Sequence, residues 1–168
     1  MNLINQPLVS RVRRNHGLEH ATIHVLGERG RLKAVAGYAT PSGFFVVGNL
    51  EAGDIAAAAG EALRRLQAGQ KHLAVHPGCG TNYATSGMLA GTLALFSVWL
   101  AGGRRQSKID QLSNATVAAT VGVLFGQALG KWIQANVTTS SDAQGMAIRR
   151  VTRILEAPAR VHFVETGF

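Results

Sequence analysis

The stretch that decides how this chain is interpreted is Arg14-Asn15-His16-Gly17-Leu18-Glu19-His20-Ala21-Thr22-Ile23-His24. Positions three and four residues apart lie on one face of an α-helix, so His16, Glu19 and His20 are expected to point the same way. This His-x-x-Glu-His spacing is that of the inverted zincins, in which two imidazoles hold a divalent metal and the carboxylate handles a proton. The stretch therefore predicts a metal site on a helix that begins near Asn15 and ends near Glu28.

The composition favours a small domain attached to a membrane. A length of 168 residues suits one domain, or a small domain with a membrane anchor. Charged residues make up 15% of the chain, below the roughly 25% of ordinary globular domains, and the mean hydropathy is positive. The net charge of +8 suits an anionic lipid surface. Because aromatic residues are only 6% and the basic residues are scattered, nucleic acid is not expected as a partner.

Two uncharged segments predict a transmembrane helical hairpin. Residues 82–103 and 111–130 contain no charged side chain, and each segment is long enough to span a hydrocarbon core. The polar segment 104–110 between them is expected to lie outside the lipid. Glycines four residues apart in both segments predict close helix packing and a homo-oligomer formed through the glycine faces. A buried hairpin in a soluble protein is the alternative interpretation.

The rest of the chain predicts one α+β unit that carries the metal site. Apolar patterns and turn residues predict strands at 32–38, 43–47, 71–75 and 161–164, and further helices at 54–67 and 141–156. The hairpin is then an insertion in this unit. The expected division is a soluble metal-site part at 1–82, the transmembrane hairpin at 83–135, and a C-terminal helix and strand at 136–168.

The second group of candidate ligands is His76-Pro77-Gly78-Cys79-Gly80-Thr81-Asn82, directly before the first uncharged segment. His76 and Cys79 lie three residues apart across a Pro-Gly turn, which can bring an imidazole and a thiolate towards one point. Cys79 is the single cysteine, so an intramolecular disulfide is excluded. On its own the turn could be a plain connection between a strand and a helix. Together, the two motifs predict a zinc ion held by His16, His20, His76 and Cys79.

Both motifs resemble those of uncharacterised bacterial membrane-protein families that are described as predicted metal-dependent enzymes. The pattern of those families is similar to His-Gly-Ala-Glu-His-Lys followed by His-Pro-Arg-Cys-Gly-Thr-Ser. The resemblance covers roughly residues 14–90. This chain departs from it at Ala21, where the families tend to have Lys, and at Gly78, where they have Arg. The resemblance implies a metal site in a membrane protein and no particular reaction.

The ligand set allows two functions from different classes. If three ligands bind and one position stays open, the protein is a zinc-dependent hydrolase acting on a peptide or lipid-linked substrate at the membrane, with Glu19 as general base. If all four bind, the site is a closed structural metal clip, and Glu19 orients an imidazole. A third interpretation makes Cys79 a nucleophile assisted by His76 or His20, but it leaves the zincin spacing without a purpose.

The expected location is an inner membrane of the bacterial type, with the soluble unit on the cytoplasmic side. Residues 1–14 contain no apolar signal-peptide region, and a lone cysteine suits a reducing compartment. The short basic loop at 104–110 argues for the opposite orientation. The expected partners are the lipid bilayer and a membrane-associated substrate. His24 is expected to be an ordinary, partly buried histidine, and the alternative is a further ligand or a hydrogen-bond partner of a ligand. His72 and His162 are expected to be structural histidines.

Overall fold

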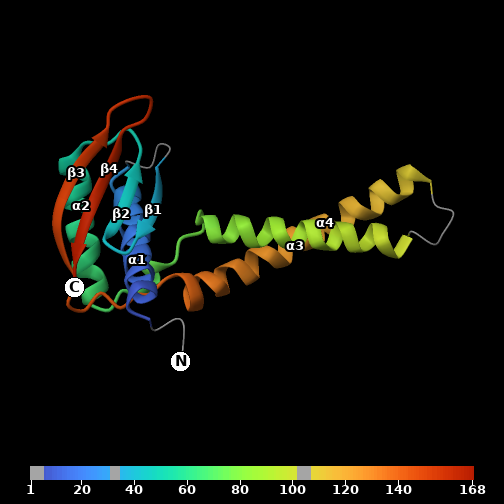
Figure 1. Cartoon of the computed structure of the whole chain (residues 1–168), viewed down its shortest axis with the longest axis horizontal. Helices are drawn as coiled ribbons and strands as arrows, with labels where there is room; N and C mark the ends of the chain where they lie inside the picture. Colours follow the sequence, from blue (N-terminus) through green and yellow to red (C-terminus); the bar gives the residue numbers. More distant parts are fainter. Residues whose placement is uncertain (1–5, 31–34, 102–106) are drawn as a thin grey trace. The chain divides into compact units, whose positions relative to one another are not determined.

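The computed structural model of the protein describes residues 6–30, 35–101 and 107–168 (Figure 1). These residues form two compact units. The first is an α+β unit with α1 (Pro7–Glu28), β1 (Ala36–Thr40), β2 (Gly43–Val47), α2 (Ala52–Gln67), the short 3-10 helix η2 (Lys71–Ala74), β3 (Ala147–Leu155) and β4 (Val161–Gly167). The second is a helical pair of α3 (Gly80–Ala101) and α4 (Lys108–Ile133), and the π-helical turn η3 (Gln134–Thr138) directly follows α4.

The α+β unit is built on a four-stranded antiparallel sheet with the order β1-β2-β4-β3. β1 and β2 form the expected hairpin. β4 pairs with β2, with Val164 opposite Phe44, so the last strand of the chain completes the sheet that the first two begin. α1 and α2 cover one face of this sheet (Figure 1). The predicted α+β class is therefore confirmed.

The core lies between the two helices and the covered face of the sheet. Phe44, Val46 and Val164 occupy inward positions of β2 and β4 and are fully buried. α2 buries Ile55 and three alanines in the same core. Because alanine side chains let helix axes approach closely, α1 packs directly against α2. With Leu18 also fully buried, α1 becomes a rigid central element of the unit.

α1 begins two turns earlier than the sequence predicted. Pro7 lies in its first turn, where the missing N–H would have no helical acceptor in any case. Asn15 is not the N-cap that was expected but a fully buried residue in mid-helix. Its Nδ2 donates to the Thr40 carbonyl at 2.8 Å, and its Oδ1 accepts from the Thr166 hydroxyl at 2.8 Å. The His-x-x-Glu-His motif therefore lies in mid-helix, where turns on both sides hold its backbone.

Two further predicted elements are wrong. Residues 71–74 form a 3-10 helix and not a strand, because their backbone bonds close locally, as from the Leu73 amide to the Gln70 carbonyl. The helix expected at 141–156 is replaced by β3, whose β-branched residues gain cross-strand partners along β4. The strand expected at 32–38 appears as β1 at 36–40, and residues 32–34 lie outside the described part of the chain.

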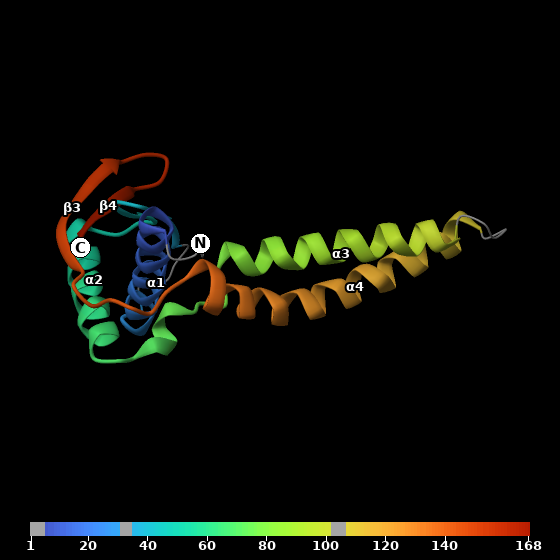
Figure 2. The same cartoon turned by 60° about the horizontal axis from the view of Figure 1, so that its bottom comes forward.

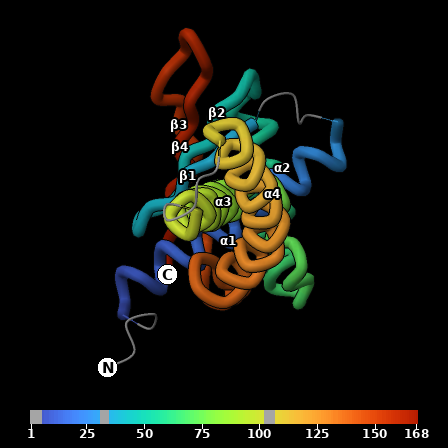
Figure 3. The backbone as a smooth tube through the Cα atoms, turned by 90° about the vertical axis from the view of Figure 1, so that its right-hand side faces the viewer, coloured from blue at the N-terminus to red at the C-terminus, as the bar shows by residue number. Residues whose placement is uncertain are grey.

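α3 and α4 run antiparallel, side by side, because glycines remove side chains from their contact (Figures 2 and 3). A Cβ added to Gly122, Gly126 or Gly130 of α4 would lie 2.5, 2.4 or 2.8 Å from the Cα atoms of Ala90, Ser86 and Asn82 respectively. Such backbone contact excludes any larger residue at these positions. Around Gly87 and Gly91 of α3, no described residue comes within 4 Å of an added Cβ. The predicted homo-oligomer through glycine faces stays a prediction.

Both long helices have the length and composition of membrane spans. The segments Gly80–Ala101 and Lys108–Thr138 contain 22 and 31 residues, and only 11% of the most apolar window of each is buried. A core helix of a soluble domain would be mostly buried, because its apolar surface must be removed from water. The two helices are therefore long and apolar enough to cross a membrane.

Candidate metal centre

α1 carries three histidines on one face. His16, His20 and His24 recur every four residues, so their rings follow one another along the helix. The ring centroids of His16 and His20 are 4.4 Å apart. Only 2% of the surface of His20 is exposed, and His16 and His24 are half-buried. The helix thus holds a row of imidazoles at the edge of the core.

Backbone carbonyls fix the tautomers of the first two rings. Nδ1 of His20 lies 2.8 Å from the Ala74 carbonyl oxygen, and Nδ1 of His16 lies 3.0 Å from the Thr138 carbonyl oxygen. A carbonyl can only accept, so the Nδ1–H donates in both rings. In the neutral imidazole, Nε2 then carries the lone pair that binds a metal. Histidines that ligate metals are commonly held by such a bond from the opposite ring nitrogen.

Gly17, within the motif itself, allows the segments that contain Ala74 and Ser140 to approach α1. A Cβ at residue 17 would lie 2.0 Å from the Ser140 carbonyl oxygen and 3.3 Å from the Ala74 Cβ. Glycine is the residue that permits such close backbone contact. The glycine of the His-Gly-Leu-Glu-His stretch therefore positions the two segments that orient His16 and His20.

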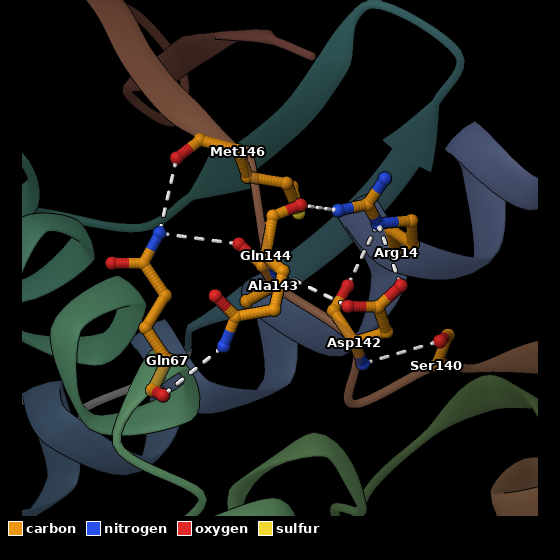
Figure 4. Close-up of polar contacts among 7 residues, drawn as sticks. All are labelled: Arg14, Gln67, Ser140, Asp142, Ala143, Gln144 and Met146. Carbon is orange, nitrogen blue, oxygen red and sulfur yellow. Dashed lines mark hydrogen bonds and ion pairs between the residues drawn. The ribbon is translucent and has the colours of Figure 1, made fainter.

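The segment 140–146 is held in place by side chains from α1 and α2 (Figure 4). Arg14 donates from Nε to the Asp142 carbonyl at 2.7 Å, and Gln67 donates from Nε2 to the carbonyls of Ala143 and Met146 at 3.1 and 3.2 Å. Gln144 returns a bond to the Gln67 carbonyl at 3.2 Å. Because this segment directly follows Thr138 and Thr139, its anchoring also restrains the carbonyl that orients His16.

His76 joins the row of imidazoles from the loop after η2. Its ring centroid lies 5.9 Å from that of His20 and 5.1 Å from that of His24. Nε2–H of His24 donates to the Val75 carbonyl at 2.9 Å and so fixes this loop on α1. The histidines of the two sequence motifs therefore lie in one cluster, although 56 positions of the chain separate His20 from His76.

His16, His20 and Cys79 form a group that could hold a metal ion. Each offers one ligand atom, and the three atoms lie within 4.8 Å of one another. Cys79 is buried, three residues after His76 and directly before α3. Two imidazoles and a thiolate are donors that suit zinc and other borderline metals. Zinc usually takes four ligands, so these three leave one position for water or a further ligand. His76 is not one of the three, although its ring lies in the same cluster of imidazoles.

Glu19 is buried on the side of α1 that faces β1. Only 3% of its surface is exposed, and its carboxylate lies against the backbone at Gly37. The group of three ligand atoms does not include this carboxylate. Its position beside His20 in the motif, together with its burial, suits a role next to the metal and not as a ligand.

His162 of β4 is the histidine that departs most from expectation. It is fully buried, and neither ring nitrogen has a hydrogen-bond partner among the described residues. Burial lowers the pKa of His162 from its ordinary value of 6.5, and the positive charge of Arg153 lowers it further. His162 pairs with Val46 and Arg153 in the sheet. The sequence predicted an ordinary structural histidine, which would have satisfied its nitrogens.

The sequence analysis missed the groups that orient the imidazoles. The carbonyls of Ala74 and Thr138 are backbone atoms, so no side-chain pattern marks them. Gly17 and Gly37 did have a signal, because a glycine inside a helix or a strand often marks close backbone approach. Neither was given a role.

The chain belongs to the protein family described as "Domain of unknown function (DUF6391)", which matches residues 11–151. It is similar to an uncharacterized protein of Picosynechococcus sp. (strain ATCC 27264 / PCC 7002 / PR-6), with 32% identity over 138 residues. The match covers 77% of this chain and 66% of that protein, so it spans just under two thirds of the relative's length. No solved structure matches the chain. The matched residues 11–151 include both motifs and the helical pair.

Proposed function

We propose that the protein is a membrane-anchored, zinc-dependent hydrolase. One observation carries the proposal: two imidazoles that donate from Nδ1 to backbone carbonyls share a site with a buried thiol, and the three ligand atoms lie within 4.8 Å. His16, His20 and Cys79 would hold the zinc ion. Three protein ligands leave a fourth position open, as catalytic zinc sites do.

The residues around the ligands have separate roles in this proposal. A zinc ion bound there would act as a Lewis acid and lower the pKa of a water molecule. Glu19, the carboxylate of the His-x-x-Glu-His motif, would take the proton as general base; it is shielded from solvent and lies against Gly37 of β1. The carbonyls of Ala74 and Thr138 keep the two imidazoles in their ligating tautomer.

The helical pair supports a substrate that is found at a membrane. α3 begins one residue after Cys79, so the proposed metal centre directly precedes a candidate membrane span. A site so tied to a span would reach peptides or lipid-linked molecules near the bilayer surface. We place the α+β unit on the cytoplasmic side, where a thiolate ligand is protected from oxidation.

The second candidate is a structural metal clip, and the support for it is that the His76 ring lies in the same cluster of imidazoles. With its ring 5.9 Å from that of His20, His76 could supply a fourth ligand and close the site. The metal would then join α1 to the loop before α3 without catalysis. In that case the open glycines of α3, Gly87 and Gly91, would serve a homo-oligomer.

Metal analysis of the purified full-length protein tests both candidates. Wild type and Glu19→Gln should contain one metal ion per chain, whereas His20→Gln and Cys79→Ser should lose it. His72→Gln is the matched control, because His72 is an exposed histidine of η2 and should leave the metal content unchanged. If the wild-type protein contained no stoichiometric metal, both candidate functions would be excluded.

His76→Gln separates the hydrolase from the clip. An open site with three ligands keeps its metal in this variant, and the X-ray absorption spectrum still reports two imidazoles and one sulfur. A closed site loses one imidazole from the spectrum and binds metal more weakly. The second result would exclude the hydrolase and support the structural metal clip.

A further inference from the structure

The helical pair contains a cavity with several polar side chains in its lining, at the end where α3 begins and α4 finishes. Its volume is about 410 Å³. The polar side chains that line it are Asn82, Tyr83, Ser86, Gln127 and Lys131. Five polar side chains around one cavity between two otherwise apolar helices are unexpected, because membrane-spanning helices normally bury small or apolar residues against each other.

Ser86 is a buried polar residue in the lining of this cavity. The residue is only 8% exposed, and its Oγ has no hydrogen-bond partner among the described residues. Its burial follows from the contact with Gly126, where the two backbones nearly touch. A buried hydroxyl is unfavourable unless a ligand or water completes its hydrogen bonding. Because Ser86 lines the cavity, a molecule bound there would supply the partner.

The charges around the cavity select an anion. Lys131 lies in the last turn of α4, and the first turn of α3 contains no acidic residue. Asp110, the one acidic residue between positions 77 and 134, lies in the first turn of α4, at the opposite end of the pair. A phosphate group matches this set of an ammonium, two amides and two hydroxyls.

We propose that this cavity binds a phosphate group, carried by the headgroup of an anionic lipid. Asn82 and Gly130 face each other near the ends of the two spans, which is the level at which lipid phosphates lie. Lys131 and Gln127 would contact the phosphate oxygens from α4, and the hydroxyls of Ser86 and Tyr83 from α3. The proposal rests on the membrane placement in the proposed function and does not depend on the metal. Free phosphate offers the same chemistry, so the test must separate the two sources.

The test uses full-length protein in neutral detergent with Trp99→Phe, which leaves Trp132 as the single tryptophan, next to Lys131. Short-chain phosphatidylglycerol, diacylglycerol of the same chain length and inorganic phosphate are titrated separately. Binding is followed by Trp132 emission and by calorimetry. Phosphatidylglycerol should bind, and diacylglycerol, which lacks the phosphate, should not. Equal affinities for inorganic phosphate and phosphatidylglycerol would overturn the lipid source.

Two variants and one control assign the binding to the cavity. Lys131→Gln should lower the affinity about tenfold or more, and Ser86→Ala about threefold to tenfold, because each loses a hydrogen bond to a charged group. Lys108→Gln removes the same charge at the other end of α4 and should change the affinity less than about twofold. Equal losses in both lysine variants, or binding of diacylglycerol as tight as that of phosphatidylglycerol, would overturn the proposal. The metal content of Lys131→Gln should equal that of wild type, so a failed metal centre and a failed phosphate site are told apart.

Discussion

The carboxylate of Glu19 on α1 occupies the space that a side chain at residue 37 of β1 would need. A Cβ added to Gly37 would lie 2.2 Å from Oε1 and 2.5 Å from Cδ of Glu19. Contacts this short cannot exist, so one residue has to lack a side chain for the other to be buried there. The proposed general base therefore depends on a glycine 18 positions further along the chain.

Gly37→Ala should destabilise the protein by about 1–3 kcal/mol, since the added methyl group displaces a buried carboxylate. Thermal unfolding followed by circular dichroism measures the change. Glu19→Ala removes the clashing group, so the double variant should be less destabilised than the sum of the two single variants. Additive effects would show that the two side chains do not share this space.

Gly17→Ala should weaken both the fold and the metal centre. Alanine normally stabilises a helix interior relative to glycine by about 0.5–1 kcal/mol. At residue 17 the added Cβ meets the Ser140 carbonyl, so we expect a loss of about 1–3 kcal/mol and a reduced metal content. Gly60→Ala in α2 is the matched control. The one atom that its Cβ approaches is Nη1 of Arg64 at 3.7 Å, so it should stabilise the protein. If both substitutions changed the free energy of unfolding in the same direction, the contact between residue 17 and the Ser140 carbonyl would be contradicted.

Gly122→Val should disrupt the helical pair, whereas Gly91→Val should not. The first places a side chain 2.5 Å from the Cα of Ala90, and the second extends into open space among the described residues. Both carry the same helix propensity change, so the difference reports packing alone. Resistance of α3 and α4 to proteolysis in detergent should fall by at least about tenfold for Gly122→Val, which corresponds to roughly 1.4 kcal/mol. Equal resistance in the two variants would argue against the antiparallel register.

His162 should make the stability of the α+β unit fall in acid. Its pKa in the folded protein is lowered from 6.5, so below about pH 6.5 the unfolded chain binds a proton that the folded chain does not. The free energy of unfolding is therefore highest above this pH and decreases as the pH falls towards the lowered pKa. His162→Leu should remove part of this decrease, as measured by the unfolding temperature across pH. His72→Gln should retain the wild-type profile, and a His162→Leu profile identical to wild type would exclude His162 as the cause.

The long helices and the imidazole row could be predicted because local sequence carries their signal. The uncharged segments appear as α3 and α4, and the spacing of His16, His20 and His24 needs nothing beyond helical geometry. β3 could not be predicted in the same way. The spacing of Ile148, Val151 and Leu155 also fits a helix. The segment is a strand because it pairs with β4, a contact that the local sequence does not contain.

The surroundings of the candidate ligands could not be predicted from the sequence for a different reason. His16 and His20 are oriented by the main chain at Thr138 and Ala74, positions whose side chains do not enter those bonds. Every residue, proline and glycine included, has a backbone carbonyl that can accept such a bond, so composition and spacing say nothing about them. The burial of Glu19 depends on Gly37, a contact between two elements that a helical pattern cannot contain.

The bonds from His20 to Ala74 and from His16 to Thr138 also have a practical consequence for protein engineering. The two imidazoles lie one turn apart on α1, about 6 Å along its axis, so the chain leaves the α+β unit and re-enters it at neighbouring points. A short glycine-serine linker from residue 76 to residue 137 could therefore replace the helical pair, as in natural domain insertions. The resulting protein would keep four of the six histidines in one cluster and should be soluble in water, which opens it to crystallisation and solution NMR without detergent.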